Sequence, residues 1–81
     1  MDDTEILGRI RDLVGEEHVL RQRVASHELS TEEEQARLRS LEQSLDQCWD
    51  LLRQRRARRD AAENPNTAAV RPAGEVEGYM Q

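Results

Sequence analysis

The segment "RLRSLEQSLDQCWDLL" (residues 37–52) decides the fold. Its apolar side chains recur at alternating steps of three and four, which is the spacing of one face of a helix. The series is Leu38, Leu41, Leu45, Cys48 and Leu52. A seam this regular predicts a long helix that packs against another helix along this line. We expect the helix to run from about residue 31 to 62, because the Asn64–Pro65 pair cannot continue it.

A second apolar series precedes this segment and predicts a helix over about residues 3–27. Its members are Ile6, Ile10, Leu13, Leu20 and Val24, with Glu17 filling one expected slot. Asp2 and Glu5 fit a variant capping box at the start of the first helix. Ser30 and Glu33 fit a capping box at the start of the second helix.

The linker between the two helices has about three residues, so the helices must be antiparallel. Facing residues of an antiparallel hairpin have a constant sum of residue numbers. Four layers obey that rule: Ile6–Leu52, Ile10–Cys48, Leu13–Leu45 and Leu20–Leu38. Two layers are imperfect, Glu17 with Leu41 and Val24 with Glu34. The predicted fold is therefore all-α, with a coiled-coil-like antiparallel hairpin over residues 1–63.

The remaining segment, "NPNTAAVRPAGEVEGYMQ" (residues 64–81), has two prolines, two glycines and no helical period. We expect an extended or semi-ordered tail. Disorder at the terminus is the simplest interpretation. The alternatives are that the tail folds back onto the hairpin or docks on a partner, and Tyr79 would be its anchor in either case.

Composition restricts the class of protein. Apolar residues make up 36% of the 81 residues and charged residues another 36%, which suits amphipathic helices better than a compact core. The N-terminus lacks the features of a signal peptide, and no run of 18 apolar residues exists. We therefore expect a soluble, cytoplasmic protein with no membrane contact.

The chain shows no constellation of residues for catalysis, a metal or a cofactor. Cys48 is the single cysteine, which excludes an intrachain disulfide and a cysteine-based zinc site. Its place in the seam favours a buried thiol that packs as a small hydrophobe. His18 and His27 are nine residues apart, which does not fit one metal site. We expect no enzymatic activity.

An arginine run, "RQRRARR" (residues 53–59), stands out in a chain of net charge −5. The predicted register places Asp3 opposite Arg55, with Asp2 and Glu5 nearby, so we expect partners within the chain for Arg53, Arg55 and Arg56. Arg58 and Arg59 are expected to project past the end of the first helix, with only Asp60 and Glu63 near them. The candidate partner-binding residues are Arg55, Arg56, Arg58, Arg59 and Tyr79.

A single hairpin buries little apolar surface, so we expect further burial by self-association. A second apolar stripe lies beside the seam and consists of Leu7, Val14, Trp49 and Leu51. Packing of this face against a second copy would give a homodimeric four-helix bundle.

Two functions remain open. The first is a non-enzymatic interaction or adaptor module that self-associates and docks a protein partner. The second is a nucleic-acid- or ribosome-associated factor that uses the arginine run for phosphate contacts. Against the second, no aromatic residues interleave the arginines to stack bases.

The sequence also resembles a known family. The segments "LDQCWDLLRQRRA" (residues 45–57) and the terminal "EGYMQ" (residues 77–81) are similar to an uncharacterised actinobacterial domain-of-unknown-function family of small helical-hairpin proteins. The resemblance covers nearly the whole chain. It implies a bacterial cytosolic helical hairpin and supplies no activity.

Overall fold

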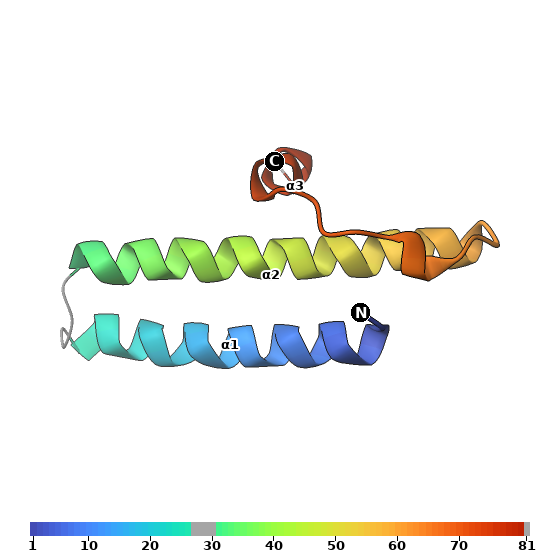
Figure 1. The fold of residues 1–81 in the computed structure, drawn as a ribbon. Helices are drawn as coiled ribbons and strands as arrows, with labels where there is room; N and C mark the ends of the chain where they lie inside the picture. The colour runs from blue at the N-terminus through green and yellow to red at the C-terminus, as the bar shows by residue number, and fades with distance from the viewer. Residues whose placement is uncertain (27–30, 81) are drawn as a thin grey trace.

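The computed structural model describes residues 1–26 and 31–80, without the side chains of Thr31, Tyr79 and Met80. Within these ranges the chain forms α1 (Asp3–Ser26), α2 (Thr31–Asp60), a short 3-10 helix η1 (Pro65–Thr67) and α3 (Ala73–Met80), with no strand (Figure 1). The predicted all-α class is confirmed.

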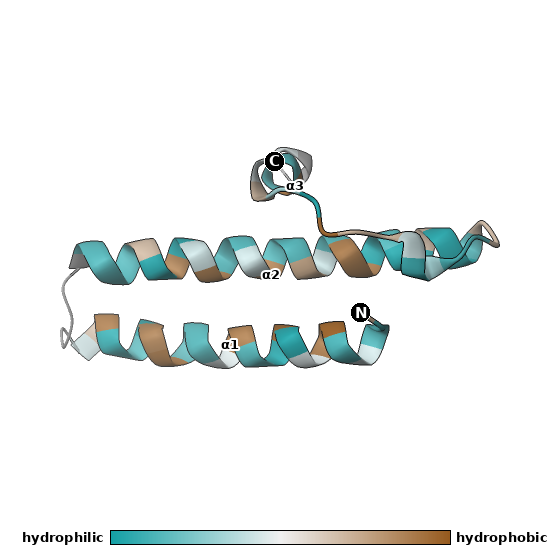
Figure 2. Cartoon of the chain, in the orientation of Figure 1, coloured by the Kyte–Doolittle hydropathy of each residue, from teal (hydrophilic) through white to brown (hydrophobic). Residues whose placement is uncertain are grey.

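The two long helices lie antiparallel and share one apolar seam, as predicted (Figure 1). Figure 2 shows the apolar bands of each helix turned toward the other. The buried cluster between them is Ile6, Ile10, Leu13, Leu20, Leu41, Leu45 and Leu51, with Leu38, Cys48, Leu52 and Ala68 packed against it. The α1 members of the four predicted layers are all buried, whereas three of the α2 members, Leu38, Cys48 and Leu52, are partly buried.

The start of α1 has the predicted cap. The backbone N–H of Glu5 donates to Oδ1 of Asp2 at 2.8 Å, so the aspartate satisfies one of the free amides of the first turn. The corresponding prediction for Ser30 lies outside the described residues.

The end of α2 is closed by a Schellman motif at an alanine. Ala62 has a φ of 59°, in the left-handed region. Its N–H bonds the carbonyl of Arg59 at 3.0 Å, and the N–H of Glu63 bonds the carbonyl of Arg58 at 2.7 Å. The helix therefore ends at Asp60, two residues before the predicted boundary, and the chain reverses.

The expectation of an extended tail is wrong for two segments, η1 and α3. After the reversal the chain returns along α2, and α3 then crosses α2 on the side away from α1 (Figure 1). Contacts between elements join α1 to α2, α2 to η1 and α2 to α3. Asn64 caps η1 by accepting from the N–H of Asn66 at 3.0 Å. An eight-residue helix containing Gly74 and Gly78 has little intrinsic stability, so packing on α2 stabilises α3.

Candidate functional site

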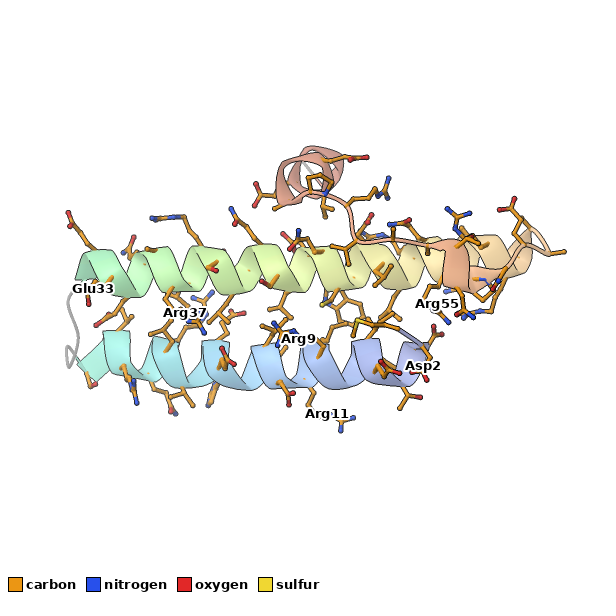
Figure 3. All side chains as sticks on the ribbon, in the orientation of Figure 1. Asp2, Arg9, Arg11, Glu33, Arg37 and Arg55 are labelled. Carbon is orange, nitrogen blue, oxygen red and sulfur yellow. The ribbon has the colours of Figure 1, made fainter. Side chains whose placement is uncertain are left out.

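The arginine run is largely neutralised by the chain itself. Arg55 is 6% exposed, and its Nε donates to Oδ1 of Asp3 at 2.6 Å. Figure 3 shows Arg55 at the end of the hairpin where α1 begins. Its Nη1 also donates to the Pro65 carbonyl at 3.3 Å and to Oδ1 of Asn66 at 3.0 Å. The predicted Asp3–Arg55 pairing is present, and burial removes Arg55 from partner contact in this conformation.

The prediction that Arg59 has no partner on the first helix is wrong. Its Nη2 lies 2.8 Å from Oδ2 of Asp3, because α2 extends far enough for its final turn to reach the start of α1. Hydrogen bonds from Arg59 and then from Arg55 lower the pKa of the Asp3 carboxyl from its usual 3.8. One aspartate thus joins two arginines of α2 to the first turn of α1.

The other arginines of the run have separate environments. Arg58 lies 3.4 Å from the Glu63 carboxylate, one of the two acids expected near it. Arg53 lies 4.0 Å from Asp50 on its own helix and has no ion pair with α1 among the described residues. Arg56 is exposed and has no ion pair among the described residues, which corrects the expectation of an acidic partner from α1.

Asp50 anchors the returning tail to α2, and sequence reasoning did not single it out. Its carboxylate is 1% exposed and accepts two hydrogen bonds from Arg71, one from Nε at 2.9 Å and one from Nη2. Gln54 donates to the same carboxylate at 2.8 Å. The bond from Arg71 is the main cause that lowers the pKa of Asp50, although burial acts in the opposite direction.

Two glutamine side chains hold the tail backbone on either side of this ion pair. Gln54 Nε2 donates to the Ala69 carbonyl at 2.8 Å, and Gln47 Nε2 donates to the Arg71 carbonyl at 3.1 Å. The anchoring positions Gln47, Asp50 and Gln54 are spaced by three and four, so they form one stripe of α2. The segment between η1 and α3 (residues 68–72), which we call the strap, is therefore held on α2 by specific polar contacts. Next to it, α3 contributes the fully buried Val76.

The hairpin has two sides, and ion pairs between α1 and α2 identify them. Because the helices are antiparallel, the residue that follows a seam position points to the same side on both helices. Arg21 follows Leu20, Glu42 follows Leu41, and their side chains pair at 2.9 Å. On the opposite side Arg37 pairs with Glu16 at 2.9 Å and lies between the helices in Figure 3.

The first side carries three large exposed apolar residues. Leu7 is 46% exposed, Val14 is 50% exposed and Trp49 is 45% exposed. Each follows a seam residue, namely Ile6, Leu13 and Cys48, so all three belong on the side of the Arg21–Glu42 pair. We call Leu7, Val14 and Trp49 the association face.

Leu51 does not belong to that face, which corrects the predicted set of four. It is 6% exposed and part of the core cluster. Leu51 precedes the seam residue Leu52, and two residues of helix rotate it about 200° from Trp49. On the side of Leu51, a small cavity is lined by this leucine together with Met1 and Val70. Val70 belongs to the tail, so the tail covers the leucine.

A groove of about 580 Å³ opens between α1 and α2 near the end of the hairpin that carries the linker. Its apolar wall includes Val19, Leu20 and Leu41. Glu34, also in the lining, is 2% exposed, and its Oε1 has no hydrogen-bond partner among the described residues. The predicted layer of Glu34 and Val24 is thus imperfect in the structure as well, because it buries a carboxylate oxygen without a hydrogen-bond donor among the described residues.

The described residues contain no group of His, Cys, Asp and Glu side chains arranged to hold a metal ion. Cys48 is half-buried against the core, and burial raises the pKa of its thiol although Arg9 acts in the opposite direction. The packing of Cys48 against the core agrees with the role expected for its thiol. His18 is exposed, and His27 lies outside the described residues. Within residues 1–26 and 31–80, no helix has the length and apolar character needed to cross a membrane.

Comparison with known proteins gives one family. The family model described as "Protein of unknown function (DUF2630)" matches residues 2–81. The chain belongs to the DUF2630 family. Uncharacterised proteins Rv0898c of Mycobacterium tuberculosis (strain H37Rv) and Mb0922c of Mycobacterium bovis are each 56% identical to it over 77 residues, which are 95% of this chain and 88% of the relative.

The resemblance to an actinobacterial family of unknown function is therefore confirmed. No solved structure matches this DUF2630 chain. The family description assigns no activity. Of the candidate partner-binding residues, Arg56 remains exposed and without an ion pair among the described residues, and the side chain of Tyr79 lies outside the description.

Proposed function

We propose that this protein is a non-enzymatic helical interaction module of the cytoplasm that associates with a second copy of itself through the association face. The observation that carries the proposal is the cluster of Leu7, Val14 and Trp49, each close to half exposed on one side of the hairpin. A contiguous apolar patch bordered by charged residues is typical of a protein–protein contact.

The position of the tail supports self-association through the side of the hairpin that carries Trp49. The strap and α3 lie on α2, held through Gln47, Asp50 and Gln54, and they bury Leu51 while Trp49 stays exposed. The described residues therefore give apolar cover to one side of α2 and none to the side of Trp49. A second copy would supply that cover.

The pairing of the arginine run argues against the nucleic-acid alternative. Arg55 and Arg59 are bound to Asp3, and Arg58 is close to Glu63. Phosphate binding needs several free cationic side chains along one surface, and these contacts remove most of them. Docking of a further protein partner through Arg56 or the tail remains part of the proposal, as a second contact of the self-associated module.

Sedimentation equilibrium of the purified chain over a range of concentrations tests the proposal. We expect a reversible dimer that weakens when Leu7→Ser or Val14→Ser is introduced. Val19→Ser is the matched control, because Val19 is 48% exposed and lies outside the association face. A wild-type chain that stays monomeric at every concentration, or equal weakening by all three substitutions, would contradict the proposal.

A further inference from the structure

Along the stripe of α2 that carries Trp49, the charges change sign at this residue. Glu42 lies seven residues before Trp49 and Arg56 seven residues after it, so all three fall on one stripe, about two helical turns apart. Asp46 and Arg53, just beside this stripe, repeat the pattern with the acid before Trp49 and the base after it. The uncovered stripe of α2 is therefore acidic toward its N-terminal end and basic toward its C-terminal end.

We propose that two copies of this chain join through a two-fold symmetric interface in which the α2 helices run antiparallel and the two Trp49 side chains meet at the axis. This inference rests on the proposed function and specifies its geometry. An antiparallel pair centred on Trp49 sets Glu42 of each copy against Arg56 of the other, and Asp46 against Arg53. Symmetry produces every such pair twice.

The apolar residues of α1 agree with the same axis. In the hairpin, Cys48 faces Ile10, so the antiparallel register sets Trp49 level with residue 9 of α1. This level lies between Leu7 and Val14. A two-fold axis there brings Leu7 of one copy near Val14 of the other, so the centre of the interface is apolar and the ion pairs flank it. Arg11 points away from α2 (Figure 3), which keeps its charge off the Trp49 stripe.

Arg56 and one carboxylate oxygen of Glu42 are available for the proposed contact. Arg56 is exposed and has no ion pair among the described residues. Glu42 uses Oε1 to accept from Arg21 at 2.9 Å, and its Oε2 has no partner within the described part of the chain. A parallel pairing of the α2 helices would instead set Glu42 against Glu42 and Arg56 against Arg56. Like charges in that register select the antiparallel arrangement.

Charge reversal in separate copies tests the geometry. Arg56→Glu alone and Glu42→Arg alone each place like charges together twice in a homodimer, so each should weaken association by about tenfold or more. An equimolar mixture of the two variants places opposite charges together at both positions. We expect the mixture to associate within about threefold of the wild-type dissociation constant.

Trp49 is the single tryptophan, so its emission reports the interface directly. We expect a blue shift and weaker quenching by acrylamide as the concentration rises. Arg9→Glu is the matched control: it makes the same change in charge, and exposed Arg9 precedes the seam residue Ile10, so it lies on the side of the Arg37–Glu16 pair, opposite the association face. It should leave association unchanged. If a charge reversal lowers helicity by circular dichroism, Arg56→Gln replaces it, with an expected weakening of about threefold.

The outcomes separate the two proposals. Rescue in the mixture, with neither variant restored alone, supports the two-fold arrangement about Trp49. A wild-type dimer that Arg56→Glu does not weaken, or a mixture that is not rescued, overturns this arrangement and leaves self-association through Leu7 and Val14 standing. A wild-type chain that remains monomeric with an unchanged Trp49 spectrum overturns both.

Discussion

Asp50 and Arg71 form a two-bonded ion pair between the middle of α2 and the returning tail, although 21 residues separate them in the sequence. The aspartate is almost fully buried, whereas the arginine keeps 30% of its side chain exposed. Because the arginine is the main compensation for a buried charge, the pair determines whether α3 docks on α2.

Removing the arginine should release the tail. We expect Arg71→Ala to cost about 1–3 kcal/mol, because it leaves the Asp50 carboxylate buried without its main donor. The loss should be local, so hydrogen exchange should accelerate in α3 around Val76 while amides near Leu13 and Leu45 stay protected. Equal acceleration in α1 and α3 would show that the tail is part of one cooperative unit.

Acid should weaken the protein through two aspartates. The pKa values of Asp3 and Asp50 are both lower in the folded chain than their usual 3.8. Their contribution to stability is therefore complete above about pH 4 and is lost as the pH falls through the folded values. Urea unfolding between about pH 2 and 7 should show the wild type and Asp50→Asn converging at the acidic end. Asp12→Asn, at an exposed site with no ion pair among the described residues, should not change the profile.

The alanine that closes α2 is a site for stabilisation. Ala62 occupies the left-handed region at a φ of 59°, which is unfavourable for a residue with a Cβ. We expect Ala62→Gly to stabilise the chain by about 0.5–1 kcal/mol, after subtraction of the larger conformational entropy that glycine loses on folding. Ala61→Gly is the control at the adjacent residue, which does not have a positive φ, and it should destabilise. Thermal melts of both variants distinguish the local backbone effect from a general effect of glycine.

The buried carboxylate of Glu34 should lower the stability of the hairpin. Its side chain is 2% exposed, and Oε1 has no partner among the described residues. Replacement by an apolar side chain removes that unsatisfied group, so we expect Glu34→Leu to stabilise the hairpin by about 1–3 kcal/mol. Gln43→Leu introduces the same side chain at an exposed position in the middle of α2, away from the helix cap, and should have little effect. Destabilisation by Glu34→Leu in urea would show that the carboxylate has a partner in solution.

The predictions from sequence were most successful where contacts repeat along regular helices. The seam through Leu41 and Leu45, the Asp2 cap and the Asp3–Arg55 pairing all follow from helical period and antiparallel register. The predictions failed where the backbone leaves that register. The pairing of Arg59 with Asp3 depends on how far α2 extends, and the burial of Leu51 depends on a tail whose path no periodicity describes.

By itself, the sequence determined that this chain forms two long helices and which of their faces meet, because apolar side chains at steps of three and four can be buried together only on one face of a helix. The tertiary structure alone decided what covers the rest of α2. The reversal at Ala62 brings Arg71 to Asp50, so the tail buries Leu51 and leaves Trp49 exposed on the other side. Such a contact depends on the direction of one turn, which the spacing of residues along two helices does not encode.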